Sequence, residues 1–337
     1  MLSILLTWFV FAIVLFISRV INGHAIFGNV LLIIEYSYDN PTSQISLQNY
    51  LYSMQFKNQI LIGPFNETKI HAIRKSIPSN NTHIRSSLSY DYKGYYGYLV
   101  AAHAMKLLPN FDGYLFVQDD VVFDFSRIVK LNLESVWITF GSTYYLDMFE
   151  FDESSDRWRK RDSNDSLVGG EGWLPTNHGI PAILRAISKD EYISTTLKNC
   201  SNGRSGLLHH GLSDIFYIPQ NLRTLFIHVA TKFDTEKLFV EYAVPTFLKC
   251  FVPSETSFQY LEVCTYNEDH VPQTEKIQRM MECDPSLFDY YHPIKLSLLV
   301  GLQFMINSRS GLLHEEDVRN LDTTSVKLLQ RVNKAAV

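Results

Sequence analysis

Two adjacent carboxylates follow a short apolar run about a third of the way along the chain. The run covers residues 113–117, and Gln118, Asp119 and Asp120 come directly after it. Carboxylates this close repel each other unless a divalent cation or hydrogen-bond donors neutralise them. Hard oxygen ligands suit Mg²⁺ or Mn²⁺, and these ions bridge phosphate oxygens. A solvated turn or a helix N-cap is the alternative interpretation, because Asp is common at both.

Further groups able to transfer protons or bind ions lie in the second half of the chain. Asp214 lies within an apolar stretch, and Glu241 opens a helical one. A carboxylate whose pKa is raised by burial can take a proton from a hydroxyl group, whereas a charge partner at a helix N-terminus is the alternative role for Glu241. His292 could bind a metal ion, and Lys295 could hold a phosphate as a point charge. The other candidate ligands are His178, His209 and His210.

Alternating patterns predict the elements that position these groups. Continuous apolar runs predict strands over residues 30–34, 59–64, 113–117 and 211–219, and helical periodicity predicts helices over 45–54, 97–108 and 221–233 and from 239 onward. This order favours an α/β fold, a single Rossmann-like domain with a mostly parallel central sheet flanked by helices. Ligands of such sheets bind at the carboxyl ends of the strands.

The stretch YLFVQDDVVF resembles the metal motif of nucleotide-sugar glycosyltransferases with the GT-A fold, particularly the Glu-Asp-Asp form of some N-acetylglucosaminyltransferases. Gln118 departs from that form at its first position. The resemblance covers about residues 28 to 300. It implies that Asp120 binds Mn²⁺ or Mg²⁺ directly, that Asp119 contacts ribose or a metal-bound water, and that His292 is a further metal ligand.

The same resemblance implies roles for residues at other strand ends. Ser37 and Tyr38 follow the first strand, where the family binds the nucleotide base, and Lys93 and Lys295 would steady the diphosphate. Glu241 matches the general base of inverting members, and Asp214 is the competing candidate for that role.

A glycosyltransferase activity follows as the expectation. The chain would move a sugar from a nucleoside diphosphate donor, with UDP expected, to a hydroxyl group of a glycan, a protein or a lipid. Two other classes stay open: a catalytically inactive relative that binds carbohydrate, suggested by Gln118, and a metal-dependent hydrolase in which water replaces the acceptor.

Composition and the N-terminal segment indicate the compartment. With 30 Lys and Arg against 35 Asp and Glu among 337 residues, the net charge is −5, which argues against nucleic acid as a partner. Residues 1–25 are apolar enough for a signal anchor or a cleaved signal peptide, followed by the GT-A-like domain at 26–305 and a helical tail at 306–337. The expected location is the Golgi or ER lumen as a type II membrane protein, or secretion.

Sequons and cysteines agree with a lumenal location. Four N-x-[ST] sequons begin at Asn66, Asn80, Asn164 and Asn199. The four cysteines are even in number and allow three pairings that the sequence leaves open.

Overall fold

The computed structural model describes most of the chain between Phe27 and His292. The described residues are 27–37, 42–53, 55–77, 81–86, 96–123, 125–139, 148–152, 157–161, 167–168, 190–200, 208–209, 211–234, 238–265, 283 and 287–292. Several sequence predictions lie outside them: the apolar segment 1–25, the tail 306–337, and Tyr38, Lys93, His178, His210 and Lys295. Within the described ranges, no helix combines the length and the apolar character needed to cross a membrane.

Helices and strands alternate along the first half of the described chain. The strands are β1 (Val30–Glu35), β2 (Asn58–Gly63), β3 (Thr82–Ser86), β4 (Gly113–Gln118), β5 (Val122–Phe123), β6 (Val136–Thr139), β7 (Met148–Asp152), β8 (Arg157–Arg161), β9 (Leu167–Val168), β10 (Leu208–His209), β11 (Ile215–Pro219), β12 (Phe258–Leu261), β13 (Val263–Thr265) and β14 (Tyr290–His292). The helices are α2 (Thr42–Ser53), α3 (Glu67–Ser76), α4 (Gly97–Leu107), α5 (Phe125–Ile128), α8 (Glu191–Cys200), the 3-10 turn η2 (Gln220–Leu222), α9 (Arg223–Asp234) and α10 (Val240–Cys250).

A seven-stranded sheet forms the centre of the molecule, in the order β12-β6-β11-β4-β1-β2-β3. Strands β3, β2, β1 and β4 are parallel neighbours, and β12 is parallel to β6. Strand β11 is antiparallel to both β4 and β6. The predicted α/β class with a mostly parallel sheet is therefore confirmed.

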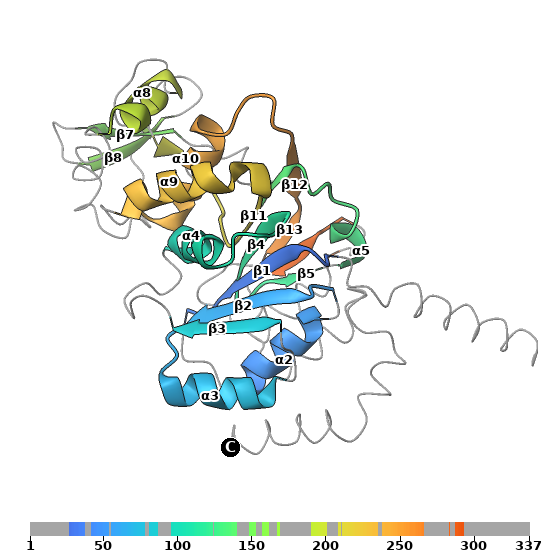
Figure 1. The fold of residues 1–337 in the computed structure, drawn as a ribbon. Helices are drawn as coiled ribbons and strands as arrows, with labels where there is room; N and C mark the ends of the chain where they lie inside the picture. The colour runs from blue at the N-terminus through green and yellow to red at the C-terminus, as the bar shows by residue number, and fades with distance from the viewer. Residues whose placement is uncertain are drawn as a thin grey trace, which may run out of the picture.

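Helices cover both faces of this sheet (Figure 1). In β1, Leu32 and Ile34 pack in one core with residues of α2 and α3, whereas Leu31 and Ile33 pack in a second core with residues of α4, α9 and α10. Because both faces are covered, every residue of β1 is buried, which explains why this strand is a continuous apolar run instead of an alternating one.

The predicted elements agree with the observed ones within a few residues, with one difference that matters for the site. The run over 211–219 predicts strand throughout, but β11 begins only at Ile215. Asp214 therefore lies in the segment just before β11 and not within it. The predicted helix over 221–233 is the short turn η2 followed by α9.

Two small sheets flank the central one. One has the order β10-β7-β8-β9, and the other has the order β13-β14-β5. In the second, β14 is antiparallel to β5, with Tyr291 opposite Val122. This pairing joins the C-terminal end of the described chain to the stretch that follows β4.

Candidate functional site

The turn after β4 holds Asp119 and Asp120 at the carboxyl edge of the central sheet. Both residues are buried, with 5% and 6% of their surface exposed. Helix α2 fixes this turn, because the Gln48 side-chain amide donates to the carbonyl of Asp119 at 3.1 Å and the Tyr52 hydroxyl donates to the carbonyl of Val121 at 2.5 Å. The turn carbonyls are buried and need such donors, so α2 determines where the two carboxylates lie.

The register of β14 brings His292 to this turn. Since Tyr291 lies opposite Val122 in the antiparallel pair, the next step of the pairing sets His292 beside the residues just before Val122. Accordingly, His292 Nε2 lies 3.3 Å from Asp120 Oδ1. Residues 120 and 292, far apart in the sequence, thus form an ion-pair contact when the imidazole is protonated.

Strand β14 is held in place where it begins. The Asp289 carboxylate accepts hydrogen bonds from Arg127 Nε at 2.7 Å and from the backbone N–H of Glu262 at 2.7 Å. Next along the chain, the hydroxyl groups of Tyr290 and Thr139 are hydrogen-bonded at 2.6 Å inside the core. These contacts fix the strand that carries His292.

Asp214 faces the other nitrogen of the same imidazole. Its Oδ2 lies 3.7 Å from His292 Nδ1, and its carbonyl accepts the N–H of Gln118 at 3.0 Å. Burial raises the pKa of Asp214; the His292 charge opposes this increase, and the charges of Asp120 and Glu241 add to it. The structure therefore brings Asp214, Asp120 and His292 together, with Glu241 near enough to act on Asp214.

Glu241 lies in the first turn of α10, and its position depends on an interior proline. Pro245 has no N–H to give to the carbonyl four residues before it, which is that of Glu241. The N–H of Gly211 donates to this carbonyl instead, at 2.9 Å. This hydrogen bond attaches the segment that leads to Asp214 to the start of α10. The two candidate bases, Asp214 and Glu241, therefore lie on segments that are bonded to each other.

Glu35 is a further buried acid that the sequence analysis did not single out. It ends β1 opposite Gln118 of β4, and only 4% of its surface is exposed. Its Oε2 has no hydrogen-bond partner among the described residues. Burial, and second the charge of Asp119, raise the pKa of Glu35 to about 8. In the sequence, the one signal for Glu35 is an acidic residue directly after the apolar run 30–34.

The remaining predicted residues are less constrained by the structure. Ser37 follows β1 at the same edge of the sheet as Asp119 and is half-buried. His209, an alternative metal ligand, is paired with Met148 of β7 and contacts α8 and α10, and no contact with Asp120 is found among the described residues. A pocket of about 120 Å³ lies against α4 and includes Glu35 but not Asp120, Asp214 or His292. We place the candidate site at the cluster of Asp120, Asp214 and His292, because these side chains can bind a metal ion or transfer a proton.

The donor set fits a hard divalent cation. Neighbouring ligands on an octahedral ion with bonds of about 2.1 Å lie roughly 3.0 Å apart, close to the 3.3 Å between Asp120 Oδ1 and His292 Nε2. Histidines that bind metal through one nitrogen commonly give the N–H of the other to a carboxylate; the Asp214 carboxylate lies on that side of the ring, with Oδ2 3.7 Å from Nδ1, which is longer than a hydrogen bond. Asp120 and His292 could thus hold the ion, and Asp214 could orient the imidazole.

Comparison with known proteins gives no family by sequence. No protein-family profile matches the chain, and no curated protein matches it. Among solved structures, mouse xyloside xylosyltransferase 1 in its apo form is 10% identical with a TM-score of 0.34, covering 79% of this chain and 96% of that one. The glycosyltransferase GlyE of Streptococcus pneumoniae TIGR4 is 10% identical with a TM-score of 0.37, covering 87% and 64%. The 4-diphosphocytidyl-2C-methyl-D-erythritol synthase of Anaerococcus prevotii DSM 20548 is 10% identical with a TM-score of 0.36, covering 71% and 89%.

Two of these three neighbours are glycosyltransferases. Their TM-scores lie below 0.5 and carry no argument about this chain. The α/β class rests on the observed sheet order.

Proposed function

We propose that this protein transfers a sugar from a nucleoside diphosphate donor to a hydroxyl group, with Mn²⁺ or Mg²⁺ as its metal. The observation that carries the proposal is the convergence of Asp120, His292 and Asp214 at the carboxyl edge of a mostly parallel sheet. When bound, the metal would neutralise the negative charge that develops on the diphosphate leaving group.

Asp120 and His292 would hold the ion, and Asp119 would contact the ribose or a water on the ion. An acidic cluster binds a diphosphate poorly by itself, because like charges repel; this is why the proposal needs a cation at Asp120. Ser37 and Tyr38 for the base, and Lys93 and Lys295 for the phosphates, stay predictions from the resemblance.

Glu241 would act as the general base. It would take the proton from the acceptor hydroxyl while that oxygen bonds to the anomeric carbon and the bond from this carbon to the diphosphate oxygen breaks. Asp214 suits the role less well, since its carboxylate already lies against His292 Nδ1. UDP is the first donor to test, and glycan, protein and lipid hydroxyls are the acceptor classes.

Two disulfides support the secretory lumen as the place of action. Cys200 is bonded to Cys250, and Cys264 is bonded to Cys283. Disulfides persist in oxidising compartments and are rare in the cytosol.

The test is binding and turnover of nucleotide sugars with Mn²⁺. The chain should be stabilised against heat by UDP or a UDP-sugar only when Mn²⁺ is present, and it should release UDP in the presence of an acceptor. Asp120→Asn should remove both effects, lowering turnover by at least about 100-fold. Asp112→Asn is the matched control, because Asp112 precedes the opposite end of the same strand.

The possible outcomes separate the proposed function from its alternatives. Binding without turnover would identify a carbohydrate-binding relative, and UDP release that is independent of any acceptor would identify a hydrolase. No stabilisation by any nucleoside diphosphate would refute the proposal.

A further inference from the structure

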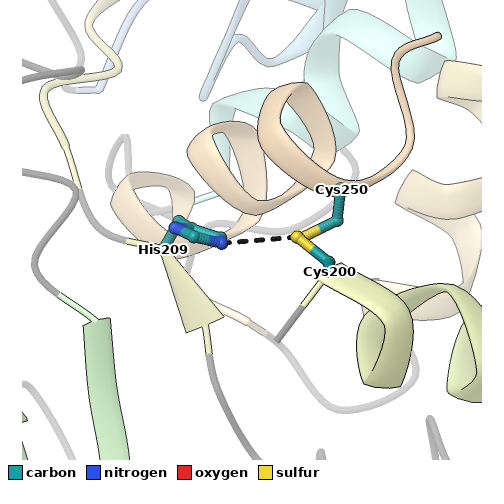
Figure 2. A group of neighbouring side chains, drawn as sticks. All are labelled: Cys200, His209 and Cys250. Carbon is teal, nitrogen blue, oxygen red and sulfur yellow. Dashed lines mark hydrogen bonds between the residues drawn. A yellow bond between two sulfur atoms is a disulfide. The ribbon is translucent and has the colours of Figure 1, made fainter. Parts of the chain in front are cut away.

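A second cluster of ligand-type side chains lies on the side of the fold formed by α8, β10 and α10. Figure 2 shows Cys200 at the end of α8, Cys250 at the end of α10, and the His209 ring beside their disulfide. His209 Nε2 lies 3.5 Å from Cys200 Sγ. One ligand atom from each of the three residues lies within 4.8 Å of the others.

These distances suit zinc as well as a disulfide. Zinc forms bonds of about 2.3 Å to sulfur and about 2.05 Å to nitrogen in a tetrahedron, so its sulfur and nitrogen ligands lie roughly 3.6 Å apart. The observed separation of 3.5 Å between His209 Nε2 and Cys200 Sγ already matches this value. Only the two sulfur atoms would have to separate, which requires that their bond be broken.

His209 is held in a form that can bind a metal. Its backbone N–H donates to Thr246 Oγ1 at 2.8 Å, which attaches β10 to α10 one turn before Cys250. The imidazole is buried, and its Nδ1 has no hydrogen-bond partner among the described residues. Burial, and second the charge of Lys249, lower the pKa of His209.

We propose that Cys200, His209 and Cys250 form a zinc site once their disulfide is reduced, with water as the fourth ligand. In the first step, two equivalents of a thiol reductant give the two protein thiols and the oxidised disulfide of the reductant. In the second step, Zn²⁺ binds both sulfur atoms and His209 Nε2, and two protons are released. The disulfide and the metal are thus alternative ways to join α8, β10 and α10.

The surroundings favour such a site. Two thiolates neutralise the two charges of the ion, so the cluster adds no net charge beside the core that α8 and α10 share. Both cysteines are half-buried, which leaves access for water at the fourth position. Because Nδ1 has no partner among the described residues, we expect binding about 10- to 100-fold weaker than at a site whose histidine is oriented by a carboxylate.

The test uses Co²⁺ as the probe and the full chain. The protein is reduced with a phosphine, freed of reductant without air, and titrated with Co²⁺, followed by displacement with Zn²⁺. One equivalent per chain should give the intense thiolate-to-cobalt absorption and the visible bands of tetrahedral cobalt. The oxidised protein should give neither, since the carboxylate and histidine donors near Asp120 include no thiolate.

Three variants assign the signal. His209→Gln keeps the disulfide, so its folding can be checked in the oxidised form, and it should lower Co²⁺ affinity by more than about 100-fold after reduction. His228→Gln, a change at an exposed histidine of α9, should leave the affinity unchanged. The double substitution Cys264→Ser and Cys283→Ser should keep the absorption, because that pair has no histidine grouped with it among the described residues.

Alkylation gives a second readout that does not depend on colour. Zn²⁺ added during reduction should protect Cys200 and Cys250, but not Cys264 and Cys283, from iodoacetamide, as measured by peptide mass spectrometry. The proposal fails if no thiolate absorption develops, if His209→Gln retains it at the same affinity, or if Zn²⁺ protects all four cysteines equally.

Discussion

His292 has a carboxylate against each nitrogen of its ring. Asp120 Oδ1 lies 3.3 Å from Nε2, and Asp214 Oδ2 lies 3.7 Å from Nδ1. A metal-bound histidine is usually oriented by a carboxylate that accepts its second N–H, and the Asp214 contact, which is longer than a hydrogen bond, would have to shorten to do this. Under the proposed function, Asp120 would bind the ion, Asp214 would orient the histidine that holds it, and Glu241 would take the proton.

Substitutions at Asp214 and Glu241 should separate these two roles. Asp214→Asn should lower Mn²⁺ affinity by about 10- to 100-fold, with kcat restored at saturating Mn²⁺, because only the orientation of His292 is disturbed. Glu241→Gln should leave Mn²⁺ affinity unchanged and lower kcat by about 10²- to 10⁴-fold, because the proton acceptor is lost. Calorimetric Mn²⁺ titration and kcat measured at several Mn²⁺ concentrations test this, and the reverse pattern would exchange the two roles.

Glu35 predicts a pH dependence of stability. Its pKa is about 8 in the folded chain, raised from an ordinary value of 4.5, so the folded state retains a proton that the unfolded state loses. The free energy of unfolding should therefore fall as pH rises from 4.5 to 8, by on the order of 5 kcal/mol from this group. Glu35→Gln cannot ionise and should lose that slope, becoming more stable than the natural chain at pH 8.

Urea unfolding at a series of pH values measures the Glu35 effect. Glu67→Gln, at an exposed position in the first turn of α3, is the control and should keep the slope of the natural chain. Parallel stability curves for Glu35→Gln and the natural chain would contradict the prediction.

Helix α10 connects two clusters: that of Asp120, Asp214 and His292, and that of Cys200, His209 and Cys250. Its first turn carries Glu241, its interior Pro245 leaves the Glu241 carbonyl to the N–H of Gly211, and its last residue is Cys250. Midway, the buried Thr246 hydroxyl accepts the N–H of His209 at 2.8 Å and donates to its carbonyl at 3.3 Å. The edge strand β10 of the sheet β10-β7-β8-β9 is thus hydrogen-bonded to a side chain of α10 and not to a further strand.

Thr246 should matter through its hydroxyl group. Thr246→Val keeps the shape but leaves the buried N–H and carbonyl of His209 without their partner, which should cost about 2 to 4 kcal/mol of unfolding free energy. Thr246→Ser keeps the hydroxyl and should cost only about 1 kcal/mol for the lost methyl group. Chemical denaturation measures both changes, and faster hydrogen exchange at the His209 amide should be found only in the valine variant. Equal costs for the two variants would show that packing alone matters here.

At the scale of the whole molecule, the two disulfides close loops of very different size. Cys200 and Cys250 are 50 residues apart, and Cys264 and Cys283 are 19 apart. Both bonds lie on elements next to the candidate site. Cys250 ends α10, which bears Glu241, and Cys264 lies in β13, which pairs with the strand of His292. Because a longer closed loop removes more entropy from the unfolded chain, the first bond should stabilise the fold more.

Paired serine substitutions test this ranking. Replacing Cys200 and Cys250 should lower the free energy of unfolding by about 4 kcal/mol, and replacing Cys264 and Cys283 should lower it by about 3 kcal/mol, as loop-closure entropy gives. Denaturation of the oxidised proteins with a metal chelator present measures the two losses. A larger loss from the second pair would mean that local packing outweighs loop entropy.

Local patterns were enough to predict much of the central sheet. The apolar runs that became β1 and β4 are unbroken because helices cover both faces, and the helix α4 follows from its strong helix formers. The carboxylates Asp119 and Asp120 were therefore correctly located just beyond a strand end, where the chain must turn. What the sequence could not give was the start of β11, because the turn that includes Asp214 is set by its hydrogen bond to Gln118.

The fold class, the carboxylate pair after β4 and the even set of cysteines could be predicted from the amino-acid pattern, since each is local or compositional. Which distant groups meet depends instead on how the chain packs in three dimensions. The contact between His292 and Asp120 depends on the register of β14 with β5, and the burial of Glu35 depends on the start of α4, where a Cβ at Gly97 would lie 3.0 Å from Glu35 Oε2. The cysteine pairing likewise depends on how α8 and α10 pack. Such contacts join segments far apart in the chain, and their energies depend on packing that no local pattern encodes.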